Sequence, residues 1–131
     1  MTPTNIIQDL SSMNLQRVRI VSEVMQTEVA YISPTVSVLH IPQMMAEKKV
    51  SFVVVAEEES EEAVFPVGII TERDIEQIQA LKLDLENIEA QTVMSAPLLY
   101  VHPNDSLLDA RLLMQRKYVQ QLLVVGMLDN W

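Results

Sequence analysis

The apolar positions of this chain follow one pattern that occurs twice, 69 residues apart. In each copy a short apolar run precedes a Ser-Pro or His-Pro pair, an amphipathic segment and a second apolar run. This pattern predicts a strand, a helix and a strand in each copy. The predicted elements are 29–32, 36–48 and 50–56 in the first copy, and 98–101, 105–117 and 121–125 in the second.

The repeat is defined by identities as well as by residue character. Because an internal repeat indicates one supersecondary unit used twice, each copy is expected to bury its apolar face against the other. The identical pairs are Val24/Val93, Met25/Met94, Tyr31/Tyr100, Pro34/Pro103, Ser37/Ser106, Leu39/Leu108, Met45/Met114, Lys48/Lys117, Val50/Val119 and Val55/Val124.

The first copy continues with a strand at 64–70 and a helix that opens at Thr71, so its order is strand, helix, strand, strand, helix. Pro42 lies inside the first predicted helix, so that helix either starts late or is kinked. Pro66 predicts that its strand lies at a sheet edge or begins after that residue. The acidic run Glu57–Glu62 predicts a solvated hairpin tip, with a cation site as the weaker alternative.

The two ends of the chain differ from this unit. Residues 1–21 carry a helical spacing of apolar residues and predict an N-terminal helical segment, ahead of a first repeat at 22–85. The second repeat, at 86–131, stops before its last strand and helix. An unpaired strand edge is unfavourable, so the chain is expected to be a fragment of a longer protein or to complete its sheet through a partner.

Composition narrows the function classes. The chain has 131 residues, of which 49% are hydrophobic, and it contains no cysteine. No apolar run is long enough to cross a bilayer and no signal peptide is recognisable, so a cytoplasmic protein without direct membrane insertion is expected. The net charge of −9, with scattered basic residues, argues against nucleic acid as a partner.

The types of residue present in the chain also argue against an enzyme. The only glycines are Gly68 and Gly126, which excludes a Walker loop and a dinucleotide fingerprint. His40 and His102 have no partners at metal-ligand spacing, and no nucleophile stands beside an acid–base pair. We therefore expect neither catalytic residues nor a metal.

The clearest motif is Val67-Gly-Ile-Ile-Thr-Glu-Arg-Asp-Ile75. Together with the duplication and the Val-Met opening of each copy, it resembles the cystathionine-β-synthase (CBS) domain family in its tandem form, the Bateman module. The resemblance covers residues 22–126. It implies an α+β fold of two β-α-β-β-α repeats, packed sheet to sheet in a pseudo-two-fold arrangement, with the second repeat incomplete.

The resemblance also implies a function. A Bateman module is a regulatory, ligand-sensing unit in signal transduction that controls an effector domain, which this chain does not contain. Candidate ligands are AMP, ADP, ATP and S-adenosylmethionine, no cofactor is required, and a homodimer is expected. The alternative is a ligand-free module for dimerisation or interaction within a larger signalling protein.

The candidate site follows from residue types at the end of a strand. Thr71 would cap the next helix and Asp74 would be its third residue, where N–H groups favour an anion. Asp74 could accept hydrogen bonds from ribose hydroxyls, Arg73 could bind phosphate, and Gly68 would permit close approach. The other interpretation of Thr71 and Asp74 is a capping box alone. The resemblance adds the adenine-enclosing positions Gln26, Val29 and Ala30.

Overall fold

The computed structural model describes residues 5–8, 19–26, 29–60, 63–96 and 98–126. These residues form the predicted α+β fold, and they contain two three-stranded sheets. The chain divides into two compact units: unit 1 contains residues 1–29 and 99–131, and unit 2 contains residues 30–98. Each unit therefore takes segments from both copies of the repeat, and the division into repeats at 22–85 and 86–131 stays a prediction. The sheet-to-sheet packing stays a prediction.

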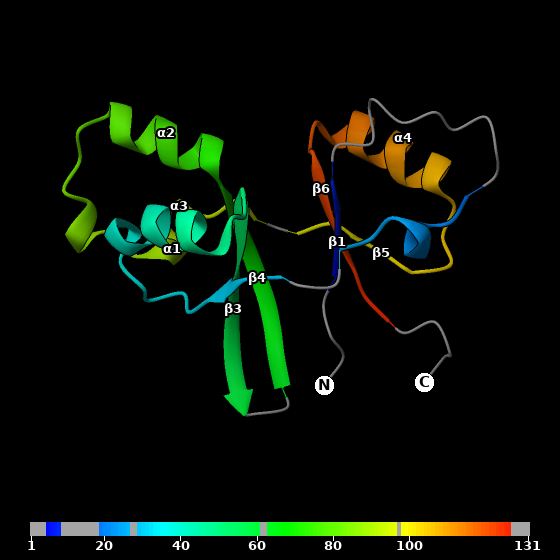
Figure 1. The fold of residues 1–131 in the computed structure, drawn as a ribbon, viewed down its shortest axis with the longest axis horizontal. Helices are drawn as coiled ribbons and strands as arrows, with labels where there is room; N and C mark the ends of the chain where they lie inside the picture. The colour runs from blue at the N-terminus through cyan, green and yellow to red at the C-terminus, as the bar shows by residue number, and fades with distance from the viewer. Residues whose placement is uncertain (1–4, 9–18, 27–28, 61–62, 97, 127–131) are drawn as a thin grey trace. The chain divides into compact units, whose positions relative to one another are not determined.

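Unit 2 is built on a sheet in the order β2-β3-β4. Helices α1 and α2 lie on one face of this sheet (Figure 1). The side chains of Ile41, Val53 and Ile70 are fully buried between the helices and the strands. The elements are β2 (Tyr31–Ile32), η3 (Val38–His40), α1 (Ile41–Lys48), β3 (Phe52–Ser60), β4 (Ala63–Thr71), α2 (Glu72–Ala80), η4 (Leu85–Asn87) and α3 (Ala90–Val93).

Strands β3 and β4 form a long antiparallel hairpin that extends beyond the helices (Figure 1). β4 is an edge strand, as Pro66 predicts. Val55 faces Gly68 and Ala56 faces Pro66, so the pairing register shifts by one residue between these two pairs. Such a bulge accommodates a residue that cannot donate to the ladder. The acidic run lies at the far end of the hairpin, where Glu57 is exposed and residues 61–62 are outside the described part.

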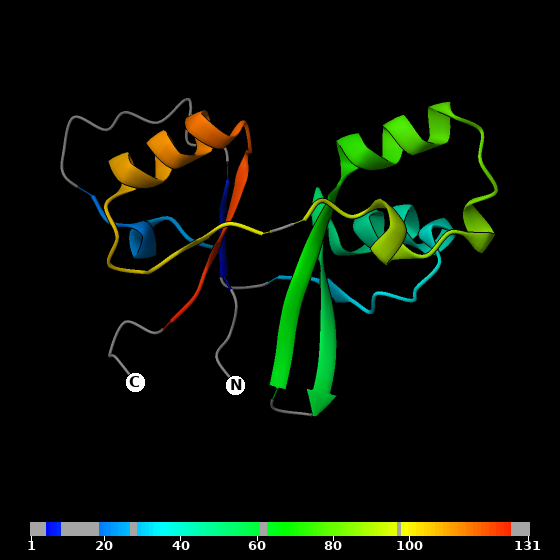
Figure 2. The same ribbon diagram turned by 180° about the vertical axis from the view of Figure 1, so that it is seen from behind.

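Unit 1 has the same layering, with its sheet in the order β1-β6-β5. Figure 2 shows α4 along one face of this sheet. The core contains Val21, Leu107 and Leu122, each at most 1% exposed. The elements are β1 (Asn5–Gln8), η2 (Val21–Glu23), β5 (Tyr100–Val101), α4 (Leu107–Lys117) and β6 (Gln121–Val124). In the described part of the chain, no helix is long and apolar enough to cross a membrane.

Strand β1 corrects two predictions. Residues 5–8 are a strand, whereas a helix was predicted throughout 1–21; residues 9–18 lie outside the described part. β1 pairs antiparallel with β6, so the chain's own N-terminal segment completes the sheet that the sequence left incomplete. The adjacent isoleucines Ile6 and Ile7 are 0% and 1% exposed. Adjacent residues of a strand point to opposite faces, so a strand buries both side chains where a solvated helix could bury only one face.

The register shows that β1 takes the place of β4 in the repeat. Ile6 faces Leu123 of β6, and Ile69 faces Val54 of β3. Leu123 and Val54 are themselves 69 positions apart, so Ile6 is the structural equivalent of Ile69. By the same register Asn5, Ile7 and Gln8 are equivalent to Gly68, Ile70 and Thr71.

Backbone hydrogen bonds on the outer side of these strands repeat the correspondence. The amide of Ile6 donates to the Gln26 carbonyl at 3.2 Å, and the amide of Gln26 donates back at 2.8 Å. Ile69 and Ser95 exchange the same two bonds at 3.2 and 2.9 Å. Gln26 and Ser95 directly follow the Val-Met openings of the two copies. Each opening therefore packs in the unit that holds the other copy's first helix.

The helix starts follow from local chemistry. α1 begins late, at Ile41, with Pro42 in its first turn, whereas α4 begins at Leu107, three positions earlier in the repeat. α2 begins with a complete capping box: the Asp74 amide donates to Thr71 Oγ1 at 3.1 Å, and the Thr71 amide donates to Asp74 Oδ2 at 2.9 Å. Both groups satisfy donors that a helix leaves unpaired at its N-terminus.

Truncation of one isoleucine tests the role of β1. Ile7→Ala should lower the free energy of unfolding by about 2–5 kcal/mol, because it removes a fully buried side chain. Ile70→Ala, at the equivalent position of β4, is the matched control and should cost a similar amount. Urea denaturation followed by circular dichroism measures both. A loss below about 0.5 kcal/mol for Ile7→Ala alone would show that β1 does not close the sheet.

Substitution of the helix cap gives a second prediction. Thr71→Ala should cost about 1 kcal/mol because the Asp74 amide loses its acceptor. Thr71→Ser keeps a hydroxyl in the same place and should recover most of that loss in the same denaturation experiment. Equal losses for the two variants would mean that the methyl group of Thr71, and not its hydroxyl, stabilises the junction.

Candidate functional site

The predicted site residues meet where β4 ends and α2 begins. Thr71 and Asp74 are half-buried and hydrogen-bonded to each other, and Arg73 is exposed beside them. The capping box that was one interpretation of these residues is therefore present in the structure. A cap and a ligand site are compatible, because only part of the hydrogen-bonding capacity of the junction is used.

The donors at the start of α2 show what remains for a ligand. The amides of Thr71 and Asp74 close the cap, and the amide of Glu72 donates to the Ser51 carbonyl at 2.8 Å. Of the amides at the start of α2, the Arg73 amide is the one that takes part in none of these bonds. It lies at the positive end of the helix dipole, on a residue that also carries a guanidinium group, so this corner can hold an anion.

The Asp74 carboxylate has a different capacity. Its Oδ2 atom accepts the Thr71 amide, and an ionised carboxylate offers further lone pairs on both oxygens. Because Asp74 is only half-buried, those lone pairs can accept hydrogen bonds from the hydroxyl groups of a ligand. Donors for an anion and an acceptor for hydroxyls thus stand within one helical turn.

The structure shows why position 68 is a glycine, which the sequence alone did not reveal. A Cβ atom added there would lie 2.3 Å from Met94 Sδ and 2.8 Å from Met94 Cβ. The methionine of the second Val-Met opening therefore packs directly on the Gly68 backbone. In unit 1 the equivalent of Gly68 is Asn5, whose Nδ2 lies 3.6 Å from Sδ of Met25, the equivalent methionine. The Val-Met pair occurs twice, 69 residues apart, and this repetition was the sequence signal that could have identified Met94 as a packing residue.

The adenine-enclosing positions that the resemblance implied are divided between the units. Ala30 belongs to unit 2, is half-buried, and its carbonyl accepts the Val54 amide at 2.9 Å. Gln26 and Val29 belong to unit 1, and their role beside the adenine stays a prediction.

The other unit has different chemistry at the equivalent junction. Gln8 occupies the place of Thr71, since it faces Gln121 as Thr71 faces Phe52. Glutamine is not a favoured N-cap residue, and the residues that follow Gln8 lie outside the described part of the chain. Within the described ranges, the structure holds no group of three or more His, Cys, Asp or Glu residues that could bind a metal ion.

Comparisons with known proteins agree with this architecture. CBS domain protein PAE2072 from Pyrobaculum aerophilum, solved in complex with AMP, is 23% identical with a TM-score of 0.70, covering 82% of this chain and 79% of its own. The CBS domain structure NE2398 is 29% identical with a TM-score of 0.63, covering 76% and 75%. The hexameric CBS-CP12 protein from bloom-forming cyanobacteria is 23% identical with a TM-score of 0.66, covering 78% and 58%.

No curated protein sequence matches the chain significantly. The model of the CBS domain family, however, matches residues 21–80 and 90–130, which together are most of the chain and correspond to the two copies of the repeat. The chain belongs to the CBS domain family, as a tandem pair of CBS domains.

Proposed function

We propose that this chain is a regulatory module that binds an adenine nucleotide or a related adenosyl ligand at the start of α2. The observation that carries the proposal is the junction in unit 2, where Arg73 offers anion donors and Asp74 offers acceptors for hydroxyls. The AMP complex of a relative with the same fold supports the choice of ligand class. No catalytic step is assigned to the chain.

Each part of such a ligand has a partner of matching chemistry. The phosphate would accept hydrogen bonds from the Arg73 amide and guanidinium. The ribose hydroxyls would donate to Asp74, and Gly68, on whose backbone Met94 packs, would lie on the strand that leads to this corner. Gln26, Val29 and Ala30, the positions that the family resemblance implies, would contact the adenine. AMP, ADP, ATP and S-adenosylmethionine all present the adenosine portion.

Regulation would follow from differential affinity. A ligand shifts a conformational equilibrium only by as much as it prefers one state over the other. For a module of two compact units, the relevant states are different arrangements of the units, which an effector domain of the parent protein, in the cytoplasm, would sense. The ligand is thus a signal and not a required cofactor.

A second candidate function is a ligand-free homodimerisation module. It is favoured by the exposed leucines of α4, of which Leu108 is 53% and Leu112 is 38% exposed. The solved hexamer of the cyanobacterial relative shows that a protein of this fold can assemble. Under this proposal the Thr71–Asp74 pair serves only as a helix cap.

Thermal unfolding with AMP, ADP, ATP and S-adenosylmethionine tests the nucleotide proposal. At one hundred times the dissociation constant, a specific ligand stabilises the folded state by about 2.7 kcal/mol, which raises the midpoint by roughly 5–15 °C. Asp74→Asn should remove most of this shift, because the neutral amide is a poorer acceptor for ribose hydroxyls. The asparagine oxygen can still accept the Thr71 amide, so the cap is kept.

Glu76→Gln is the control, since it makes the same charge change on the same helix beyond the first turn and should leave the shift intact. A nucleotide shift that survives Asp74→Asn would contradict the placement of the site. No shift with any of the four ligands, together with a dimer whose population rises with concentration in sedimentation velocity, would favour the second function.

A further inference from the structure

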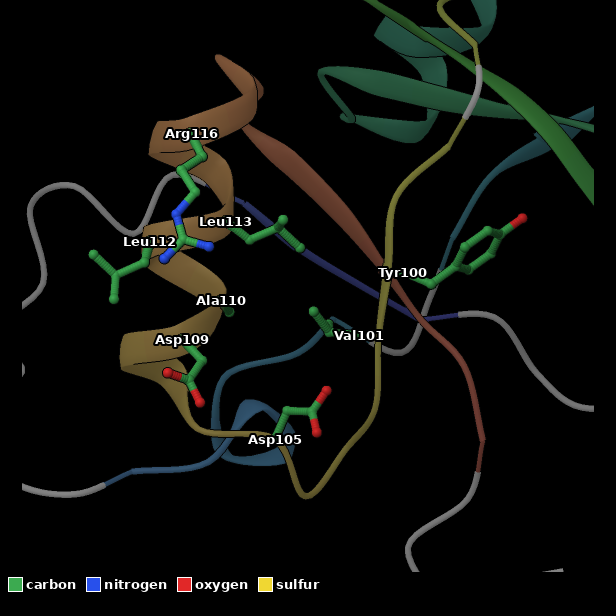
Figure 3. Close-up of a pocket in the computed structure, with 8 residues that line it drawn as sticks. All are labelled: Tyr100, Val101, Asp105, Asp109, Ala110, Leu112, Leu113 and Arg116. Atoms are coloured by element: carbon green, nitrogen blue, oxygen red, sulfur yellow. The ribbon is translucent and has the colours of Figure 1, made fainter.

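Unit 1 contains a groove that is separate from the junction in unit 2. It lies between α4 and β5 and has a volume of about 370 Å³ (Figure 3). This volume is within the range of small-molecule sites. Val101, Ala110 and Leu113 form its apolar part, and Asp105, Asp109 and Arg116 carry its charges.

The charges are arranged by sign along α4. Asp109 and Arg116 are seven residues apart, so they lie on the same face of the helix and about 10 Å apart along its axis. Figure 3 shows the two aspartates near the start of the helix, and the Arg116 side chain running from near its end back toward Leu112 and Leu113. The groove thus has an acidic end, an apolar middle and a basic end.

The charged groups that line the groove can still form hydrogen bonds and ion pairs with a ligand. Asp105 Oδ2 accepts the amide of His102 at 2.8 Å, which fixes this carboxylate at the mouth of the groove. Within the described part of the chain, the Asp109 carboxylate and the Arg116 guanidinium have no hydrogen-bond or ion-pair partner. Asp109 and Arg116 are too far apart in the helix to form an ion pair with each other, because side chains on one helix pair when they are three or four residues apart.

The first copy of the repeat serves as an internal control for these residues. The equivalents of Asp109 and Arg116 in the first copy are His40 and Glu47, so the charge pattern is not kept. The equivalent of Ala110 is Ile41, a larger side chain that is fully buried in unit 2. The repeat therefore folds without this set of charges, and the position that is isoleucine in unit 2 carries the smaller alanine in unit 1.

We infer that the groove of unit 1 binds a small zwitterion whose ammonium and carboxylate groups are separated by an apolar segment of up to about 10 Å. The ammonium group binds Asp105 and Asp109, and the carboxylate accepts two hydrogen bonds from the Arg116 guanidinium. The apolar segment covers Ala110 and Leu113. This site uses residues of unit 1 alone, so it goes beyond the nucleotide proposal and does not depend on it.

Isothermal titration of the full chain with ω-amino acids tests the inference. The probes are 4-aminobutanoate, which is too short to reach both ends, and 8-aminooctanoate, whose extended chain matches the separation. Octylamine and octanoate carry one charge each on the same apolar chain. The inference predicts that 8-aminooctanoate binds more tightly than all three other probes, at least about twofold for each added charge contact.

Three variants assign the binding to the groove. Arg116→Gln and Asp109→Asn should each weaken binding of 8-aminooctanoate by about two- to fivefold, the value of one exposed charge pair. Ala110→Ile should abolish it by filling the groove with the residue of the first copy. Glu47→Gln, at the position of unit 2 equivalent to Arg116, is the matched control and should change nothing.

Several results would overturn the inference. These are no measurable binding of 8-aminooctanoate, equal binding of octylamine or octanoate, and binding that Arg116→Gln and Asp109→Asn leave unchanged. If Ala110→Ile fails to fold, the two charge variants decide the question, because both side chains are at the surface. The nucleotide shift of unit 2 should persist in all the folded variants, so the two proposals can fail separately.

Discussion

The structure of unit 1 depends on the pairing of β1 with β6. β5 covers only one side of β6, so Leu122 to Val124 would otherwise present an unpaired edge while their side chains are buried. Asn5 to Gln8 pair with that edge and bury two isoleucines. The contact joins residues at opposite ends of the sequence, which makes it costly in loop-closure entropy and slow to form. The sheet that α4 packs against in unit 1 therefore contains this pairing of distant segments.

The two copies share a framework but have diverged in chemistry. Each Val-Met opening packs in the unit built on the other copy, and each methionine lies against the strand that closes that unit. Gly68 opposes Met94 in unit 2, where Thr71 then caps α2. Asn5 and Gln8 replace this pair in unit 1. One copy thus has the capped junction on which the nucleotide proposal rests, and the other has the groove lined by charges of both signs.

The sequence predicted most of the local structure because the repeat supplied each element twice. The β-branched run before Ala56, the late start of α1 at Pro42 and the cap at Thr71 are all local effects. β1 was predicted wrongly because Ile6 and Ile7 fit a helix as well as a strand until the partner strand is known. The division of the repeats into units, the Gly68–Met94 contact and the groove at Ala110 result from pairings distant in the sequence. No periodicity within one segment encodes such pairings.

Native-state amide hydrogen exchange, measured by NMR, tests most directly whether one framework closes both units. The reciprocally bonded amides of Ile6 and Gln26 are the equivalents of those of Ile69 and Ser95. If β1 takes the place of β4, both pairs should be protected from exchange, with the two amides of each pair opening together. Protection of Ile69 and Ser95, combined with exchange of Ile6 and Gln26 at the rate of an unstructured chain, would contradict the account.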